Sequence, residues 1–196
     1  YTNSSSFPYT ESHGMIRKEN QTDGVLVYGT NNDAIFDIFN LHSFQKAGIC
    51  ELNNINSIII GEELANELNI KIGDKVMLFN LNELISDNSF KAENFYVTGL
   101  FSTGFPEYDK LPVFIHIERA KYLFSIKGYT GIIISLKNIK EMDYFSASIE
   151  SVIPETFKLT TWKERHYELM SWLTIYDIPI KILMVFITLI AIFNIA

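Results

Sequence analysis

The chain has 196 residues, of which 47% are apolar and 20% are charged, a balance typical of a folded globular protein and not of a disordered one. Its 23 acidic residues outnumber its 16 basic ones, and the formal net charge of -7 argues against a nucleic-acid-binding surface. Cys50 is the only cysteine, which excludes an internal disulfide and a thiolate metal cluster. The length allows one large domain or two small ones.

The first half of the chain alternates short apolar runs with turns rich in Gly and Asn. Strands are predicted where turns bound such runs, at 25–28, 57–60 and 75–79. Residues 34–41 are expected to form one or two helical turns, and 62–69 a helix with Leu64, Ala65 and Leu68 on one face. The polar stretch 80–94 is expected to be an extended loop or a hairpin tip.

The second half continues the mixed order of strands and helices. Strands are predicted at 95–98, 113–117, 131–136 and 157–160. Helices are predicted at 118–124, at 142–152, where Met142, Phe145 and Ile149 recur at helical spacing, and at 162–172, which is rich in aromatic residues. Strands outnumber helices, and this order indicates an α+β fold.

Two catalytic signatures are matched in part, by spacing alone. Ser43-Phe-Gln-Lys46 and Ser86-Asp-Asn88 match two motifs of penicillin-recognising serine enzymes, but the K-T-G motif of that class is missing. Gly99 and Gly104 have the spacing of a phosphate-binding loop, but Phe105 and Pro106 stand where Lys and Ser or Thr are needed. Both matches are therefore interpreted as coincidental.

The four histidines, His13, His42, His116 and His166, are scattered and lack the short spacing of metal-ligand pairs. The carboxylates show no informative spacing either. We therefore predict no catalytic, cofactor-binding or metal-binding residues, and we expect the chain not to be an enzyme.

The C-terminal segment is apolar to its last residue. After Lys181 its only polar side chains are Thr188 and Asn194, which lie far apart around a helix. A helix without a polar face is either buried in a core or surrounded by lipid. Residues 177–196 are predicted to begin a transmembrane helix, with Pro179 in its first turn and Lys181 reaching the headgroups. Aromatic residues suited to a membrane interface precede it, namely Trp162, Tyr167, Trp172 and Tyr176.

The order of several segments resembles that of bacterial FtsX-like and MacB-like permeases. The resemblance rests on 57–78, with its Gly73-Asp74 turn, on 95–101 and on 113–123. The closing segments Thr161–Met170 and Ala191–Ile195 are similar to the lipoprotein-releasing (LolC/LolE) permease subunits. Together these segments extend the resemblance over roughly residues 24–196.

The resemblance implies a MacB-like periplasmic core, with a porter-like α/β part and a smaller β-rich inserted subdomain at about 45–125. This core would fill an extracytoplasmic domain at 1–176, followed by the membrane helix. The chain would then belong to a permease subunit of a type VII, mechanotransmitting ABC transporter in the bacterial inner membrane. Its expected partners are a separate ATP-binding subunit, a second permease subunit, a lipoprotein cargo and a periplasmic carrier, and no cofactor is expected.

One segment departs from the lipoprotein-releasing pattern. In the subunit that recruits the carrier, the segment equivalent to 80–94 forms a proline-bounded hook, whereas here it contains neither proline nor arginine. Alternatives therefore stay open: an FtsX-like regulator of cell-wall hydrolases, a MacB-like efflux permease, or a membrane-anchored serine enzyme based on Ser43.

Overall fold

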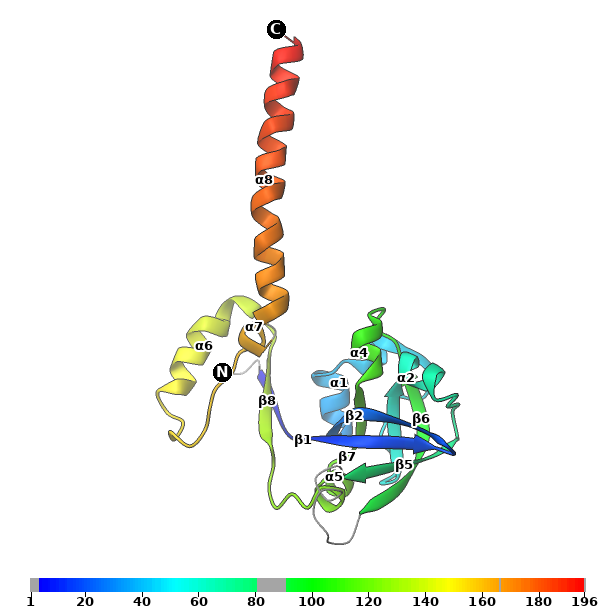
Figure 1. Cartoon of the computed structure of the whole chain (residues 1–196). Helices are drawn as coiled ribbons and strands as arrows, with labels where there is room; N and C mark the ends of the chain where they lie inside the picture. The colour runs from blue at the N-terminus through cyan, green and yellow to red at the C-terminus, as the bar shows by residue number, and fades with distance from the viewer. Residues whose placement is uncertain (1–3, 81–90, 166, 196) are drawn as a thin grey trace. The chain divides into compact units, whose positions relative to one another are not determined.

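The structure is a computed structural model that describes residues 4–80, 91–165 and 167–195. The chain forms two compact units, Tyr1–Lys137 and Asn138–Ala196 (Figure 1). Strands and helices are mixed along the chain, which confirms the predicted α+β class. The predicted boundaries at 176 and at about 45–125 stay predictions.

The first unit contains most of the regular structure. Its strands are β1 (Ser4–Lys18), β2 (Gln21–Thr30), β3 (Gln45–Gly48), β4 (Ser57–Gly61), β5 (Lys75–Asn80), β6 (Ala92–Phe101), β7 (Pro112–His116) and β8 (Gly131–Leu136). Its helices are α1 (Asn32–Asp37), the 3-10 turn η1 (Leu41–Phe44), α2 (Glu62–Glu67), α4 (Pro106–Lys110) and α5 (Ile117–Leu123).

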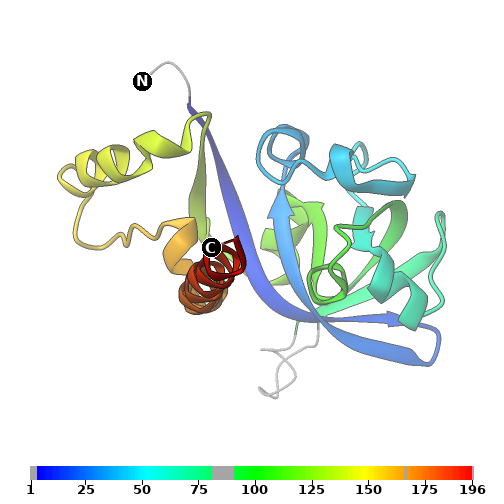
Figure 2. The same cartoon turned by 90° about the horizontal axis from the view of Figure 1, so that it is seen from above.

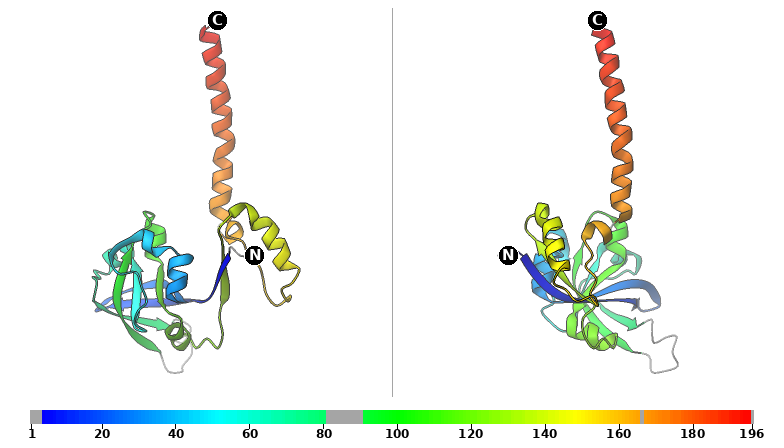
Figure 3. Two further views of the ribbon diagram at one scale, coloured as in Figure 1. Left: turned by 180° about the vertical axis from the view of Figure 1, so that it is seen from behind. Right: turned by 90° about the vertical axis from the view of Figure 1, so that its left-hand side faces the viewer.

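Strand β1 closes six strands into a ring. The order β2-β7-β4-β6-β5-β1 is completed because Thr10–Lys18 of β1 pairs with β2 while Gly14–Arg17 also pairs with β5. The first part of β1 leaves the ring and pairs with β8, as Figures 2 and 3 show. Closure leaves each ring strand with a partner strand on both sides, so the ring has no edge strand.

Two apolar clusters lie on opposite faces of the ring strands, because side chains alternate along a strand. In β4, Ile58 and Ile60 belong to the larger cluster, whereas Ile59 belongs to the smaller one. The larger cluster is completed by α2 and α5 through Leu64 and Leu123, among others. Burial on both faces explains why β4 is a continuous apolar run and not an alternating one.

The second unit contains η2 (Ile139–Glu141), α6 (Met142–Glu150), α7 (Trp162–Arg165) and α8 (Tyr167–Ile195). Thr161 and Glu164 form a reciprocal cap at the start of α7, with Glu164 N–H donating to Thr161 Oγ1 at 3.3 Å and Thr161 N–H donating to Glu164 Oε2 at 2.8 Å. The strand predicted at 157–160 is wrong, since these residues form no regular structure and Phe157 is exposed.

Helix α8 differs from the expected C-terminal helix in where it starts. It begins at Tyr167, so Pro179 lies inside it and not in its first turn. Proline has no N–H to donate to the carbonyl of Ile175, which weakens the helix at that point. Over the described residues, no helix is both long enough and apolar enough to cross a membrane. The membrane span predicted at 177–196 is not confirmed, and the side chains of Trp172 and Tyr176 lie outside the described residues.

Candidate functional site

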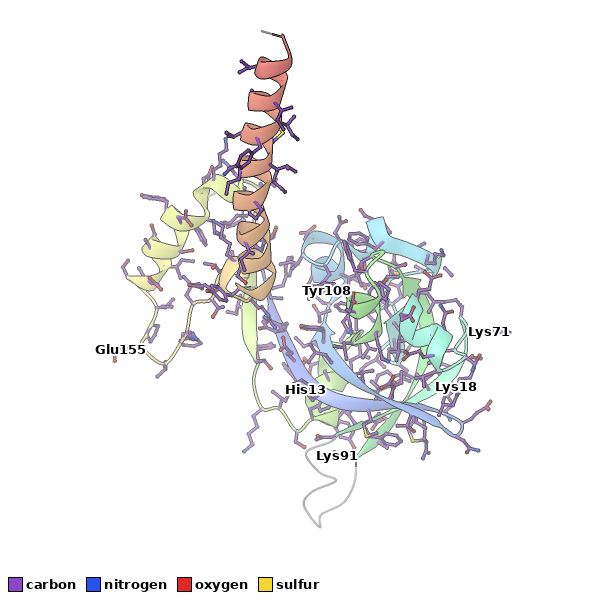
Figure 4. All side chains as sticks on the ribbon, turned by 45° about the horizontal axis from the view of Figure 1, so that its top comes forward. His13, Lys18, Lys71, Lys91, Tyr108 and Glu155 are labelled. Carbon is purple, nitrogen blue, oxygen red and sulfur yellow. The ribbon has the colours of Figure 1, made fainter. Side chains whose placement is uncertain are left out.

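The base of the β5–β6 hairpin is fastened to α5 and the turn that follows it. The buried side chain of Asn80 donates from Nδ2 to the carbonyl of Leu123 at 3.3 Å. Lys91 donates from Nζ to Ser125 Oγ at 2.6 Å and lies 5.4 Å from the ring centroid of Tyr122 (Figure 4). Most of the loop predicted at 80–94, residues 81–90, lies outside the described residues.

A second contact joins α5 to strand β6 of the same hairpin. Arg119 forms an ion pair with Glu93 at 2.8 Å, and its guanidinium lies 5.8 Å from the ring centroid of Phe95. Both charged side chains are mostly buried, which strengthens the pair relative to one in open water. The hairpin base and α5 are therefore expected to move as one body.

The predicted Gly73-Asp74 turn is present and is bound to β1. Gly73 has φ +86, a conformation that favours glycine, and its N–H donates to the carbonyl of Val97 at 2.8 Å. The Asp74 carboxylate accepts hydrogen bonds from Lys18 Nζ and from the N–H of Lys71, two residues on the same side of the unit in Figure 4. These donors, Lys18 first, hold the pKa of Asp74 below its usual value.

Hydrogen-bond donors of the Gly99–Gly104 segment are bound by a carboxylate of the chain itself. Asp109, only 3% exposed, accepts hydrogen bonds from Thr103 N–H at 2.9 Å, Thr103 Oγ1 at 2.8 Å and Ser102 Oγ at 3.3 Å. A phosphate loop needs such donors free for its ligand. The geometry therefore supports the interpretation of this match as coincidental. Sequence reasoning missed Asp109, because no sequence motif links an Asp to hydroxyl residues six and seven positions before it.

Ser43 and Lys46, the residues of the S-x-x-K match, are exposed and have different partners. Ser43 Oγ donates to Asn40 Oδ1 at 3.0 Å, and Lys46 Nζ lies 3.4 Å from Glu62 Oε1. A serine nucleophile needs a base within hydrogen-bonding reach, and Lys46 is engaged by a carboxylate instead. The second motif, Ser86–Asn88, lies outside the described residues.

Two of the histidines contact neighbouring side-chain or backbone groups of the fold. His42 packs edge-on against Phe36 with ring centroids 4.6 Å apart, and His116 Nδ1 accepts from Glu118 N–H at 3.4 Å at the start of α5. His13 is exposed on β1, as Figure 4 shows, and His166 lies outside the described residues. Within the described part of the chain, no three His, Cys, Asp or Glu residues are grouped so that they could hold a metal ion.

Cys50 lies in the smaller apolar cluster, where its Sγ donates to the carbonyl of Leu100 at 3.6 Å. Burial raises the pKa of its thiol to about 11. The thiol is therefore protonated at neutral pH, and because only the thiolate is a strong nucleophile or metal ligand, Cys50 is a packing residue.

Comparisons with known proteins agree with this architecture. The family model of the MacB-like periplasmic core domain matches residues 4–152. The fold is similar to the extracellular domain of the noncanonic ABC-type transporter YknZ from Gram-positive bacteria, with 13% identity, a TM-score of 0.52 and coverage of 72% of this chain and 69% of that one. It is also similar to the periplasmic region of MacB from Actinobacillus actinomycetemcomitans, with 16% identity, a TM-score of 0.53 and coverage of 78% and 69%. No curated protein sequence matches the chain.

Proposed function

The chain belongs to the MacB-like periplasmic core domain family, and we propose that it transmits movement within an ABC transporter, as the extracytoplasmic part of a permease subunit. In this role a separate cytoplasmic ATPase closes on nucleotide, and its movement reaches this domain through the membrane helices. The domain then acts on cargo by displacement and needs no chemistry of its own. Its partners are the ATP-binding subunit and a second permease subunit in the bacterial inner membrane.

The observation that carries this proposal is the closed, filled ring of the first unit. Its strands are packed on both faces, as Ile58, Ile59 and Ile60 illustrate. A densely packed interior has low compressibility and passes on a displacement instead of absorbing it. The hairpin base, fastened to α5 by Asn80 and Lys91, extends this stiffness to one end of the ring.

We also propose that residues 177–196 begin a transmembrane helix in the intact permease. Support comes from the apolar side chains of α8 that are exposed all round the helix, namely Ile180, Ile182, Leu183, Met184, Val185, Phe186, Ile187, Ile190 and Ile192. Each square ångström of apolar surface left in water costs about 25 cal/mol, which favours lipid as the solvent of this segment.

Lipoprotein release is the cargo hypothesis that the sequence favours. It rests on the similarity of Thr161–Met170 and Ala191–Ile195 to the lipoprotein-releasing subunits. Efflux of the MacB type and regulation of a cell-wall hydrolase of the FtsX type are equally compatible with the family. Docking of a periplasmic carrier at 80–94 has weaker support, because that segment lacks the proline-bounded pattern of the hook.

The test reconstitutes the full-length permease with its ATPase in proteoliposomes that contain a fluorescent triacylated lipoprotein. We expect ATP to release lipoprotein into the soluble fraction in the presence of a carrier, and an ATPase variant that cannot hydrolyse ATP to release none. ATP hydrolysis without release of the lipoprotein would contradict the lipoprotein hypothesis. It would not contradict the proposal that the domain transmits movement. Failure of any ABC ATPase to co-purify with the permease would overturn the proposed function itself.

A further inference from the structure

Helix α4 and the two residues that flank it present three apolar side chains to solvent. Phe105, Tyr108 and Leu111 follow one another at intervals of three residues and are 63%, 43% and 51% exposed. Asp109, between them in sequence, is buried. Surface helices normally show the opposite arrangement, with the apolar stripe inward. We call these three residues the α4 stripe.

The α4 stripe is held rigidly at both ends. On its N-terminal side, Asp109 fixes the 102–103 turn through Thr103, as described above. On its C-terminal side, the carbonyl of Leu111 accepts from the N–H of Leu26 in β2 at 2.8 Å. The ring centroids of Phe105 and Tyr108, the latter labelled in Figure 4, lie 6.3 Å apart in an edge-to-face arrangement. Rigid, exposed aromatic side chains lose little entropy when a partner covers them, which is a property of interface anchors.

Carboxylates surround the α4 stripe. Lys110 contacts Glu67 at 2.7 Å and Asp23 at 3.6 Å, and α4 itself carries Glu107 and Asp109. Asp109 is buried, so the three remaining carboxylates and one ammonium give the surface of this region a formal charge of -2. An anionic membrane surface is repelled by such a region, and so is the same region of a second copy.

We propose that the α4 stripe docks a partner protein through a segment whose apolar centre is flanked by lysine or arginine. Phe105, Tyr108 and Leu111 would supply the apolar contact, and Glu107 and Glu67 would face the basic side chains. The inference stands on the geometry of the first unit alone and does not depend on the cargo of the transporter.

The test uses the full-length protein in lipid nanodiscs and two fluorescein-labelled synthetic peptides. Both peptides share the centre Leu-Phe-Leu, and one is flanked by four lysines while the other is flanked by four glutamates. We expect the lysine-flanked peptide to bind and the glutamate-flanked one not to. Phe105→Ser/Leu111→Ser should raise the Kd of the lysine-flanked peptide at least tenfold. The matched control Ile55→Ser/Ile139→Ser, which also removes two exposed apolar side chains, should change it less than twofold.

Three outcomes would overturn the proposal. The first is binding of neither peptide, or equal binding of both. The second is binding of phosphatidylglycerol vesicles that is lost in Phe105→Ser/Leu111→Ser, which would make the α4 stripe a lipid contact. The third is a self-association, measured by sedimentation, that the same variant abolishes. Glu107→Lys provides an independent check. It should weaken binding of the lysine-flanked peptide, because it replaces a carboxylate by an ammonium, while the α4 stripe and the fold of the unit stay unchanged.

Discussion

At the scale of single residues, the buried carboxylate of Asp109 holds the turn between β6 and α4. Asp109→Asn keeps the size of the side chain but replaces one of its two acceptor oxygens by an NH2 donor, so the donors of Thr103 and Ser102 are left with a single oxygen to share. Because buried donors without acceptors carry a desolvation cost, we expect the free energy of unfolding to fall by about 1–3 kcal/mol. Urea unfolding followed by circular dichroism measures this change. Glu107→Gln, an exposed change in the same helix, is the control, and an equal loss in both variants would contradict the role given to Asp109.

Asp74 should make the stability of the first unit depend on pH. Its pKa is lowered in the folded state by the hydrogen bonds from Lys18 and from Lys71 N–H, so the folded state favours the ionised form. The stabilisation is therefore present above the unfolded pKa, about 3.9, and is lost as the pH falls through the lower folded pKa. We expect Asp74→Asn to lower the unfolding midpoint in urea at pH 7, with a difference from the unsubstituted protein that shrinks steadily below about pH 4.

Lys18→Met tests the cause assigned to this shift. It removes the first donor to Asp74 and should reproduce most of the loss of stability of Asp74→Asn at pH 7. The double variant Lys18→Met/Asp74→Asn should therefore lose less stability than the sum of the losses of the two single variants. Additive losses would show that the two residues act independently and would remove the ion pair as the origin of the pH dependence.

At the scale of elements, the approach of α4 to the start of α2 depends on Gly61. A Cβ at Gly61 would lie 1.8 Å from the carbonyl oxygen of Asp109, a backbone atom that cannot turn aside. Gly61→Ala must therefore displace α4, and we expect a loss of about 1–3 kcal/mol or more in the free energy of unfolding. Gly24→Ala is the matched control, because nothing lies within 4 Å of its added Cβ. Thermal unfolding of the two variants decides the point, and equal midpoints would contradict the close packing of these helices.

Elements with a local apolar signal were predictable from the sequence. The strands predicted at 57–60 and 131–136 correspond to β4 and β8, and the helix predicted at 62–69 contains α2. Strand β1 was missed because its residues are mostly polar and because it also pairs with β5 and β8, which are distant in sequence. The strand predicted at 157–160 had a suitable composition but no pairing partner among the described residues.

The site was less predictable than the fold. The Gly73-Asp74 turn could be recognised from its residues, but its bond to Lys18 joins segments that only the fold brings together. Helix α4 was not predicted, because it is only 5 residues long and its sequence shows no apolar periodicity. Asp109 and the α4 stripe therefore became visible only when the burial of each side chain was known.

At the scale of the whole molecule, the proposed function requires a stiff unit that is displaced as one body. The first unit is closed by β1 and filled on both faces of its ring strands. The chain continues from it into α6, α7 and the 29-residue helix α8. If the proposed function holds, nucleotide binding at the distant ATPase must displace the first unit as one body.

The most direct test is a distance measurement between the two permease subunits of the assembled transporter. A nitroxide is placed at the exposed position Lys127 by Lys127→Cys in a cysteine-free background with Cys50→Ala, and a second nitroxide is placed on the extracytoplasmic domain of the other permease subunit. We predict that double electron–electron resonance gives distinct distances without nucleotide and with ATP trapped by a hydrolysis-deficient ATPase, and that ADP restores the first distance. An unchanged distance in a transporter that hydrolyses ATP would contradict mechanical transmission by this domain.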